Sequence, residues 1–236
     1  MVGVMCYNKN FMRALLTILT LLAITSCQSQ PDKKDYPTFL KGVLAQRTAY
    51  KNAYDKAVGF SKDSLIKEAR NYLVSTISEE VFPYWYGTPW DFNGTTRKPG
   101  QGKIACGYFV TTVLEDVGFN IPRTAWAQSA SEVFIKKRAT DNIKRFSNRP
   151  LSEVKNYLLA GGDGLYVVGL DIHVGFIVVK GKSISFVHSN YYQPEIGVMK
   201  QDIDAKSPFK DSNYRIIGKL MSDEMVVKWL NNTTYD

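Results

Sequence analysis

The chain has 236 residues, of which 44% are hydrophobic and 22% are charged, and its formal net charge is +8. This length and balance suit one globular domain with a sizeable hydrophobic core. The basic residues are scattered and form no nucleic-acid-binding motif, so the composition argues against a nucleic-acid partner.

The N-terminus carries the pattern of a bacterial export signal. Lys9 and Arg13 form a basic region before an uncharged, mainly apolar run that extends from Ala14 to Ile24. This run is shorter than the ~20 residues of a membrane-spanning helix. The run leads into Leu22-Ala23-Ile24-Thr25-Ser26-Cys27, which resembles the lipobox of bacterial lipoproteins. We interpret residues 1–26 as a lipoprotein signal peptide and Cys27 as the lipidated first residue of the mature protein. The alternative is an ordinary secretory peptide, or a short hydrophobic helix with an incidental cysteine.

Residues 27–37 are polar and contain proline, which is typical of a flexible tether between a lipid and a domain. Acyl chains on Cys27 would hold the protein on a membrane without a spanning segment. Gln28 does not resemble an inner-membrane retention signal. We therefore expect a protein of the bacterial cell envelope, anchored by lipid to the outer membrane and facing the periplasm or the cell surface.

Helical periodicity dominates the first part of the remaining domain, residues 38–236. Apolar residues recur at helical spacing from Thr38 to Phe60 and from Leu65 to Ile77, with a cap at Ser61 to Asp63 and a stop at Pro83. These two helices form an N-terminal extension of about residues 38–82. An aromatic, turn-rich loop is expected over 83–102, and further helices over 106–117, 124–138, 151–160 and 223–230.

Four segments rich in β-branched and aromatic residues predict strands at Leu165–Leu170, His173–Lys180, Ser183–His188 and Tyr214–Leu220. Turn-forming dipeptides bound them, so we expect antiparallel pairing. Helices followed by a meander indicate an α+β domain in which the helices pack on an antiparallel sheet.

Cysteine usage singles out Cys106. Cys6 leaves with the signal peptide and Cys27 carries lipid, so Cys106 is the one free thiol expected in the mature chain. An unpaired thiol is unusual in an oxidising compartment and indicates a reactive cysteine. The alternative is a buried structural cysteine.

A nucleophilic role needs an activated thiol. Cys106 is predicted to begin a helix, where the N–H groups and the dipole favour a thiolate, and such a thiol should react with iodoacetamide well below pH 8. The chain has two histidines, His173 and His188, on adjacent predicted strands that bring both to the same end of the sheet. One imidazole can act as base and the other can orient it, although a strand histidine is more often a plain structural residue. Two histidines and one thiol lack the close spacing of a metal site.

Four segments carry a further signal: Pro83-Tyr84-Trp85-Tyr86-Gly87, Ala105-Cys106-Gly107-Tyr108-Phe109-Val110, Gly162-Asp163-Gly164-Leu165-Tyr166-Val167 with His173-Val174-Gly175-Phe176-Ile177, and Phe186-Val187-His188-Ser189. Together they resemble the NlpC-type cysteine peptidases, papain-like hydrolases of the bacterial cell wall. The resemblance covers roughly Asp63 to Leu220.

The resemblance implies a papain-like NlpC-type fold with Cys106 as nucleophile, His173 as general base and His188 as its orienting partner. It also implies that Tyr84 lines the cleft beside the nucleophile and that the Cys106 N–H contributes to an oxyanion hole. Such enzymes cleave amide bonds of peptidoglycan stem peptides through an acyl-enzyme, without a metal or other cofactor. Asp91 is a candidate to recognise the free amine of a stem peptide.

The family usually has an acidic residue before the cysteine and a serine after it, whereas this chain has Ala105 and Gly107. We expect these changes to leave the catalytic chemistry intact and to alter specificity. Two other functions stay open: a non-catalytic papain-like lipoprotein that binds envelope glycan or a partner protein, and an acyl hydrolase or transferase acting on lipid or another amide. The sequence predicts no particular oligomeric state.

Overall fold

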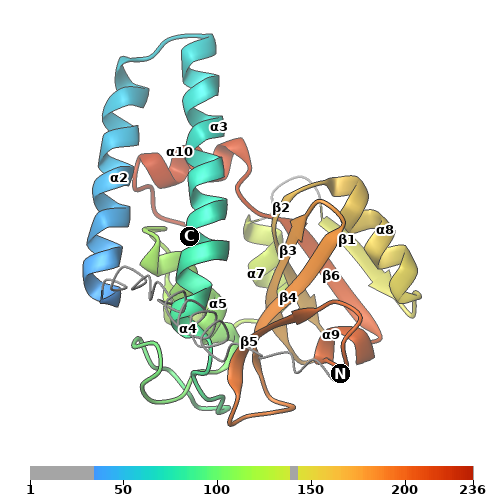
Figure 1. The fold of residues 1–236 in the computed structure, drawn as a ribbon. Helices are drawn as coiled ribbons and strands as arrows, with labels where there is room; N and C mark the ends of the chain where they lie inside the picture. The colour runs from blue at the N-terminus through green and yellow to red at the C-terminus, as the bar shows by residue number, and fades with distance from the viewer. Residues whose placement is uncertain (1–34, 139–142, 236) are drawn as a thin grey trace, which may run out of the picture. The chain divides into compact units, whose positions relative to one another are not determined.

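The computed structural model describes residues 35–138 and 143–235 (Figure 1). The predicted signal peptide, Cys27 and the tether up to Lys34 lie outside the described residues. The last residues of the predicted tether belong instead to a helix, because Asp35 accepts a hydrogen bond from the Thr38 N–H and Pro37 stands in the first helical turn.

Two antiparallel helices form a hairpin on one side of the molecule (Figure 1). Helix α2 spans Tyr36–Lys56 and helix α3 spans Phe60–Ser75. The predicted first helix therefore ends four residues early, and Phe60 belongs to α3. The chain turns at Gly59, whose φ of 53° suits glycine, and Gly59 is the N-cap in place of the predicted cap at Ser61 to Asp63.

Helical structure continues beyond α3 and past the stop predicted at Pro83. A π-helical segment, η1, spans Thr76–Val81, and a short helix, α4, spans Phe82–Trp85. Pro83 was expected to end the helix, but it lies in the first turn of α4, where its missing N–H costs no helical hydrogen bond.

The remaining helices largely follow the predicted order. They are α5 at Cys106–Asp116, α6 at Arg123–Ala127, α7 at Ser131–Arg138, α8 at Leu151–Gly161, α9 at Pro208–Asp211 and α10 at Asp223–Leu230. The segment predicted as one helix over 124–138 is two helices, α6 and α7, and α9 was not predicted. Within the described residues, no helix combines the length and apolarity needed to cross a bilayer.

The α+β class is confirmed, with a six-stranded sheet whose neighbouring strands are all antiparallel. Its strands are β1 at Ile143–Ser147, β2 at Gly164–Leu170, β3 at Val174–Lys180, β4 at Ser183–Asn190, β5 at Gly197–Asp202 and β6 at Tyr214–Lys219. The strand order is β1-β6-β2-β3-β4-β5. Strands β1 and β5 were not predicted, and both are edge strands.

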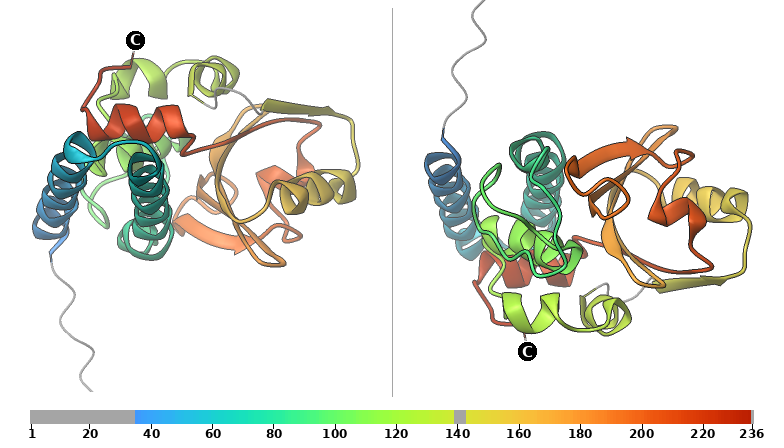
Figure 2. Two further views of the ribbon diagram at one scale, coloured as in Figure 1. Left: turned by 90° about the horizontal axis from the view of Figure 1, so that it is seen from above. Right: turned by 90° about the horizontal axis from the view of Figure 1, so that it is seen from below.

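The sheet is covered on both faces (Figure 2). On one face, Leu165 and Val167 of β2 join a hydrophobic core with helices α2, α3, α5 and α10. On the other face, Tyr166 and Val168 join a second core with α8 and α9. The central strands are apolar at successive positions because neighbouring side chains point to opposite, equally buried faces.

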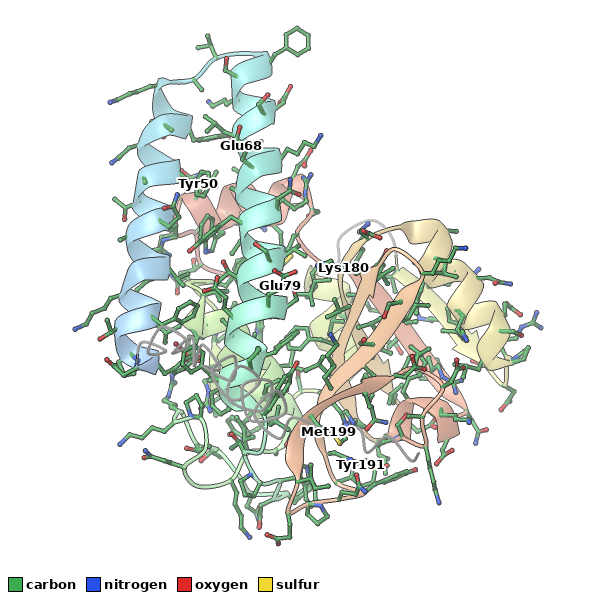
Figure 3. The ribbon with its side chains drawn as sticks, in the orientation of Figure 1. Tyr50, Glu68, Glu79, Lys180, Tyr191 and Met199 are labelled. Carbon is green, nitrogen blue, oxygen red and sulfur yellow. The ribbon has the colours of Figure 1, made fainter. Side chains whose placement is uncertain are left out.

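The helical hairpin and the sheet are also joined at the surface. Glu79 on η1 and Lys180 at the end of β3 point toward one another (Figure 3), with 2.9 Å between Glu79 Oε1 and Lys180 Nζ. Both side chains are exposed, so this ion pair adds little stability.

Candidate active site

Cys106 occupies the predicted position at the start of a helix. It is the first residue of α5, and Ala105 before it has no side-chain oxygen to cap the helix. The loop leading to it is fixed by backbone hydrogen bonds from Ile104 N–H to the Pro89 carbonyl (2.9 Å) and from Ala105 N–H to the Gly94 carbonyl (2.8 Å). The Ser189 hydroxyl on β4 donates to the Ile104 carbonyl (2.7 Å), which ties the loop to the sheet.

Gly107 lies where α5 and α6 approach one another. A Cβ atom at this position would lie 2.3 Å from the Ala127 carbonyl oxygen, so a serine does not fit here. Helix α6 approaches α5 closely at this point because Gly107 has no side chain.

The two histidines lie at one end of β3 and β4, as predicted. His173 immediately precedes β3, and His188 is in β4. The antiparallel register places His188 opposite Gly175, two residues along from His173, so the imidazoles form a diagonal pair on one face. A Cβ on Gly175 would lie 2.9 Å from the His188 Cβ, so the missing side chain leaves room for the pair.

The imidazoles are buried and hydrogen-bonded to one another, with 2.8 Å between His173 Nε2 and His188 Nδ1. His188 Nε2 lies 3.4 Å from the Gln201 Oε1, and the Gln201 amide donates to the Lys206 carbonyl (3.2 Å). This last bond turns the Gln201 oxygen toward His188, which makes His188 Nε2 a donor and His188 Nδ1 an acceptor. His173 Nε2 is then a donor, and the lone pair of His173 lies on Nδ1.

His173 Nδ1 is buried and has no hydrogen-bond partner within the described part of the chain. A buried imidazole nitrogen without a partner is unusual in a folded protein and needs an explanation. His173 lines three cavities, and Cys106 lines two of these. The structure therefore brings the predicted nucleophile and base to the same cavities, with no hydrogen bond between the thiol and the imidazole.

Burial keeps the imidazoles neutral. It lowers the pKa of His188 to about 4, with the Gln201 hydrogen bond acting in the opposite direction. Burial also lowers the pKa of His173 well below its usual value, and the neighbouring His188 adds to this effect. Both rings are therefore uncharged at neutral pH, and His173 Nδ1 is free to accept a proton.

The thiol is also neutral in this structure. Cys106 is partly exposed where it lines the cavities, but the surrounding protein raises its pKa through desolvation. The backbone N–H groups of Val174 and Gly107 oppose this effect by stabilising the thiolate. Burial raises the pKa of the thiol by more than the helix start lowers it.

The two predicted substrate-binding residues do not line either cavity. The Tyr84 ring packs between those of Tyr36 and Phe39 on α2, with centroid distances of 4.9 and 5.3 Å. The carboxylate of Asp91 accepts from the Asn93 N–H (2.9 Å) and pairs with Lys103 (3.4 Å), and both contacts lower its pKa. Tyr84 and Asp91 therefore stabilise the helical hairpin and a loop turn.

The aromatic residue beside the imidazoles is Tyr191 and not the predicted Tyr84. The Tyr191 ring lies 5.1 Å from the His173 ring and 6.0 Å from the Trp90 ring, and all three residues line one cavity. Tyr191 could have been identified from the sequence, because it lies in the turn directly after the strand that bears His188.

The cavities differ in size and chemistry. The larger has a volume of about 740 Å³ and is walled by Trp90, Phe92, Tyr108 and Tyr191. The smaller has a volume of about 250 Å³ and is lined in part by Thr111, Ser129 and Asp171. Both cavities adjoin Cys106, so a substrate that reaches the sulfur has space beside it.

Within the described residues, no group of three or more histidine, cysteine or acidic side chains is arranged to hold a metal ion. The arrangement found is a thiol at a helix start and a buried imidazole nitrogen without a partner, both beside the same two cavities. Comparison of the chain with protein-family models, with curated proteins and with solved structures finds no match.

Proposed function

We propose that this protein is a cysteine hydrolase with a papain-like NlpC-type domain, which cleaves an amide or related acyl bond through a thioester on Cys106. The observation that carries this proposal is the unpartnered, buried Nδ1 of His173 in cavities that Cys106 also lines. The His188 and Gln201 side chains hold that nitrogen in its proton-accepting form.

In this mechanism the Cys106 sulfur attacks the substrate carbonyl carbon while His173 Nδ1 takes the thiol proton. Both groups are neutral before attack, so proton transfer accompanies formation of the sulfur–carbon bond. The first N–H groups of α5 stabilise the negative charge on the carbonyl oxygen. His173 then protonates the leaving amine or alcohol, and a water molecule hydrolyses the thioester.

The substrate predicted from the family resemblance is the peptidoglycan stem peptide. Purified protein incubated with peptidoglycan should release soluble muropeptides, and Cys106→Ala should abolish the release. Cys106→Ser is the matched control for shape, because it keeps a side chain of similar size with a weaker nucleophile. Circular dichroism of both variants reports whether the fold survives. Equal release by wild type and Cys106→Ala contradicts the hydrolase.

We further propose that lipid on Cys27 tethers the enzyme to the cell envelope, with the outer membrane as its site. The proposal rests on the lipobox-like sequence ending at Cys27. Cys27→Ala should move the protein from the membrane fraction to the soluble fraction. Unchanged membrane association of that variant contradicts the anchor.

A non-catalytic binding protein is the second candidate, and one observation favours it. Burial raises the pKa of the Cys106 thiol, as it does for an inert structural cysteine. This candidate predicts that envelope glycan or a partner protein binds equally well to wild type and to Cys106→Ala, with no Cys106-dependent hydrolysis.

A further inference from the structure

The larger cavity beside Cys106 has an apolar character that the proposed peptide substrate does not need. Its walls include the aromatic rings of Trp90, Phe92, Tyr108 and Tyr191 and the aliphatic side chain of Ile172. Among the described residues that line it there is no Asp, Glu, Lys or Arg, and burial keeps its histidine, His173, neutral by lowering the pKa of the imidazole. Its volume of about 740 Å³ lies within the range of about 300–1,000 Å³ typical of small-molecule sites.

Two large apolar side chains stand exposed at this cavity. Phe92 is 79% exposed and Ile172 is 78% exposed, and they come from separate loops that precede α5 and β3. Exposed apolar side chains that gather at one cavity mark a ligand-binding surface more strongly than scattered ones. Burying them under a ligand would remove apolar surface from water, which favours an apolar ligand.

Several polar groups near Cys106 are already engaged, whereas Trp90 Nε1 and His173 Nδ1 of the larger cavity have no hydrogen-bond partner within the described residues. The Gln128 amide donates to the Tyr108 hydroxyl (3.2 Å) in the larger cavity. The one acidic residue of the smaller cavity is Asp171, among the residues described there. Its carboxylate accepts hydrogen bonds from Ser212 Oγ and from the Asn213 and Tyr214 N–H groups. The acidic side chain at these two cavities is thus already satisfied, which leaves no free carboxylate among the described lining residues to bind the amine of a stem peptide.

We infer that the larger cavity binds the aliphatic chain of an uncharged acyl compound, which is an ester, thioester or amide with its carbonyl group at Cys106. Hydrolysis of that compound rests on the proposed function of Cys106, whereas binding of the chain does not. The apolar walls supply the binding energy, and the small cavity holds the remainder of the molecule.

The test uses N-alkyl iodoacetamides with methyl, butyl and octyl chains. The Cys106 sulfur displaces iodide from the reagent, the thiol proton passes to the imidazole or to solvent, and peptide mapping measures the rate at Cys106 alone in the full chain. The rate should rise with chain length, by up to about fourfold for each methylene that the cavity buries. Free cysteine in the same buffer should show no such rise. Equal rates for methyl and octyl reagents on the protein would overturn the inference.

Variants at the cavity sharpen the test. Ile172→Ser and Phe92→Ser should each reduce the ratio of octyl to methyl rates several-fold. Phe60→Ser is the matched control, because Phe60, the first residue of α3, is 91% exposed and lines neither cavity. An unchanged ratio in both cavity variants contradicts the inference. Protection of Cys106 by a charged muropeptide or a chito-oligosaccharide, but not by an octanoyl amide, also contradicts it.

The outcomes separate this inference from the proposed function. Alkylation needs a reachable thiol but no acyl-enzyme, so chain-length dependence without hydrolysis would overturn the hydrolase alone. Cys106-dependent hydrolysis without chain-length dependence would overturn the apolar site alone.

Discussion

The proton-accepting form of His173 depends on a residue that does not line the cleft. The Gln201 oxygen lies 3.4 Å from His188 Nε2, and the Gln201 amide is held by the Lys206 carbonyl. Without this oxygen, His188 Nε2 loses its acceptor and His188 is free to place its proton on Nδ1. His188 Nδ1 could then no longer accept from His173.

Gln201→Leu should therefore reduce kcat by about fivefold, the effect of one hydrogen bond worth about 1 kcal/mol. It should also move the acidic limb of the pH profile of kcat/KM, because His188 and His173 would titrate differently. Lys200→Ala is the control, since neighbouring side chains of β5 point to opposite faces. A lower melting temperature with an unchanged pH profile would reduce Gln201 to a purely structural residue.

The ionisation of Cys106 is a second property of single residues that can be measured. Burial raises the pKa of the thiol, so the thiolate fraction at a given pH is smaller than in free cysteine. The rate of alkylation by iodoacetamide should rise with pH and reach its plateau later than that of free cysteine. A plateau already present below pH 7 would show a preformed thiolate–imidazolium pair, contrary to the neutral pair described above.

At the scale of elements, the contact of α5 with α6 fixes the position of the nucleophile. Gly107→Ala places a Cβ 2.3 Å from the Ala127 carbonyl oxygen, which is too close for the present packing. The helices must move apart, which should cost roughly 1–3 kcal/mol of unfolding free energy. Gly42→Ala in α2 is the matched control, because a Cβ there meets no atom within 4 Å and should raise stability by up to about 1 kcal/mol. Urea denaturation of both variants checks this, and equal stabilisation by both would disprove the contact.

Most elements with a continuous apolar stripe could be predicted from the sequence, and those without one could not. Helix α5 and strands β2, β3, β4 and β6 lie close to their predicted bounds, since each buries a regular apolar pattern. Strand β1 has only one buried residue, Phe146, and β5 has two buried residues at its start. Such edge strands depend on pairing with a neighbour, which no local pattern reveals.

The predicted site divides in the same way. Cys106, His173 and His188 were identified because their residue types are rare in this chain and carry chemistry, and the fold brings them to one region. Tyr84 and Asp91 were placed at the cleft by resemblance alone, and the packing of α4 on α2 directs Tyr84 elsewhere. Gln201 could not be predicted, because its role depends on strand β5 and on the register of Met199 with His188.

For the molecule as a whole, buried titratable groups set the pH range of stability. His188 is fully buried and its pKa falls to about 4, so the folded state binds its proton less readily than the unfolded state does. The stability that depends on neutral His188 is therefore complete above pH 6.5. It is lost as the pH falls toward 4, by roughly 3 kcal/mol in total.

Asp116 acts in the opposite direction. Burial raises the pKa of its carboxyl group to about 6 despite the hydrogen bond from Tyr36 (2.6 Å), so the fold gains stability as the pH falls below 6. Urea denaturation between pH 7 and pH 4.5 should show a shallower acid loss for His188→Gln than for wild type, and a steeper one for Asp116→Asn. Identical slopes for all three proteins would contradict these assignments.

The central claim is that the Cys106 sulfur becomes covalently attached to the acyl part of the substrate. The direct measurement is mass spectrometry of protein quenched in acid during the first turnover of an acyl ester, followed by mapping of the Cys106 peptide. We predict an added acyl mass on Cys106, which hydroxylamine should remove. The His173→Ala variant should form this acyl-enzyme at least a hundredfold more slowly than wild type. Hydrolysis of the ester with no added mass on Cys106, and at an undiminished rate in Cys106→Ala, would contradict the claim.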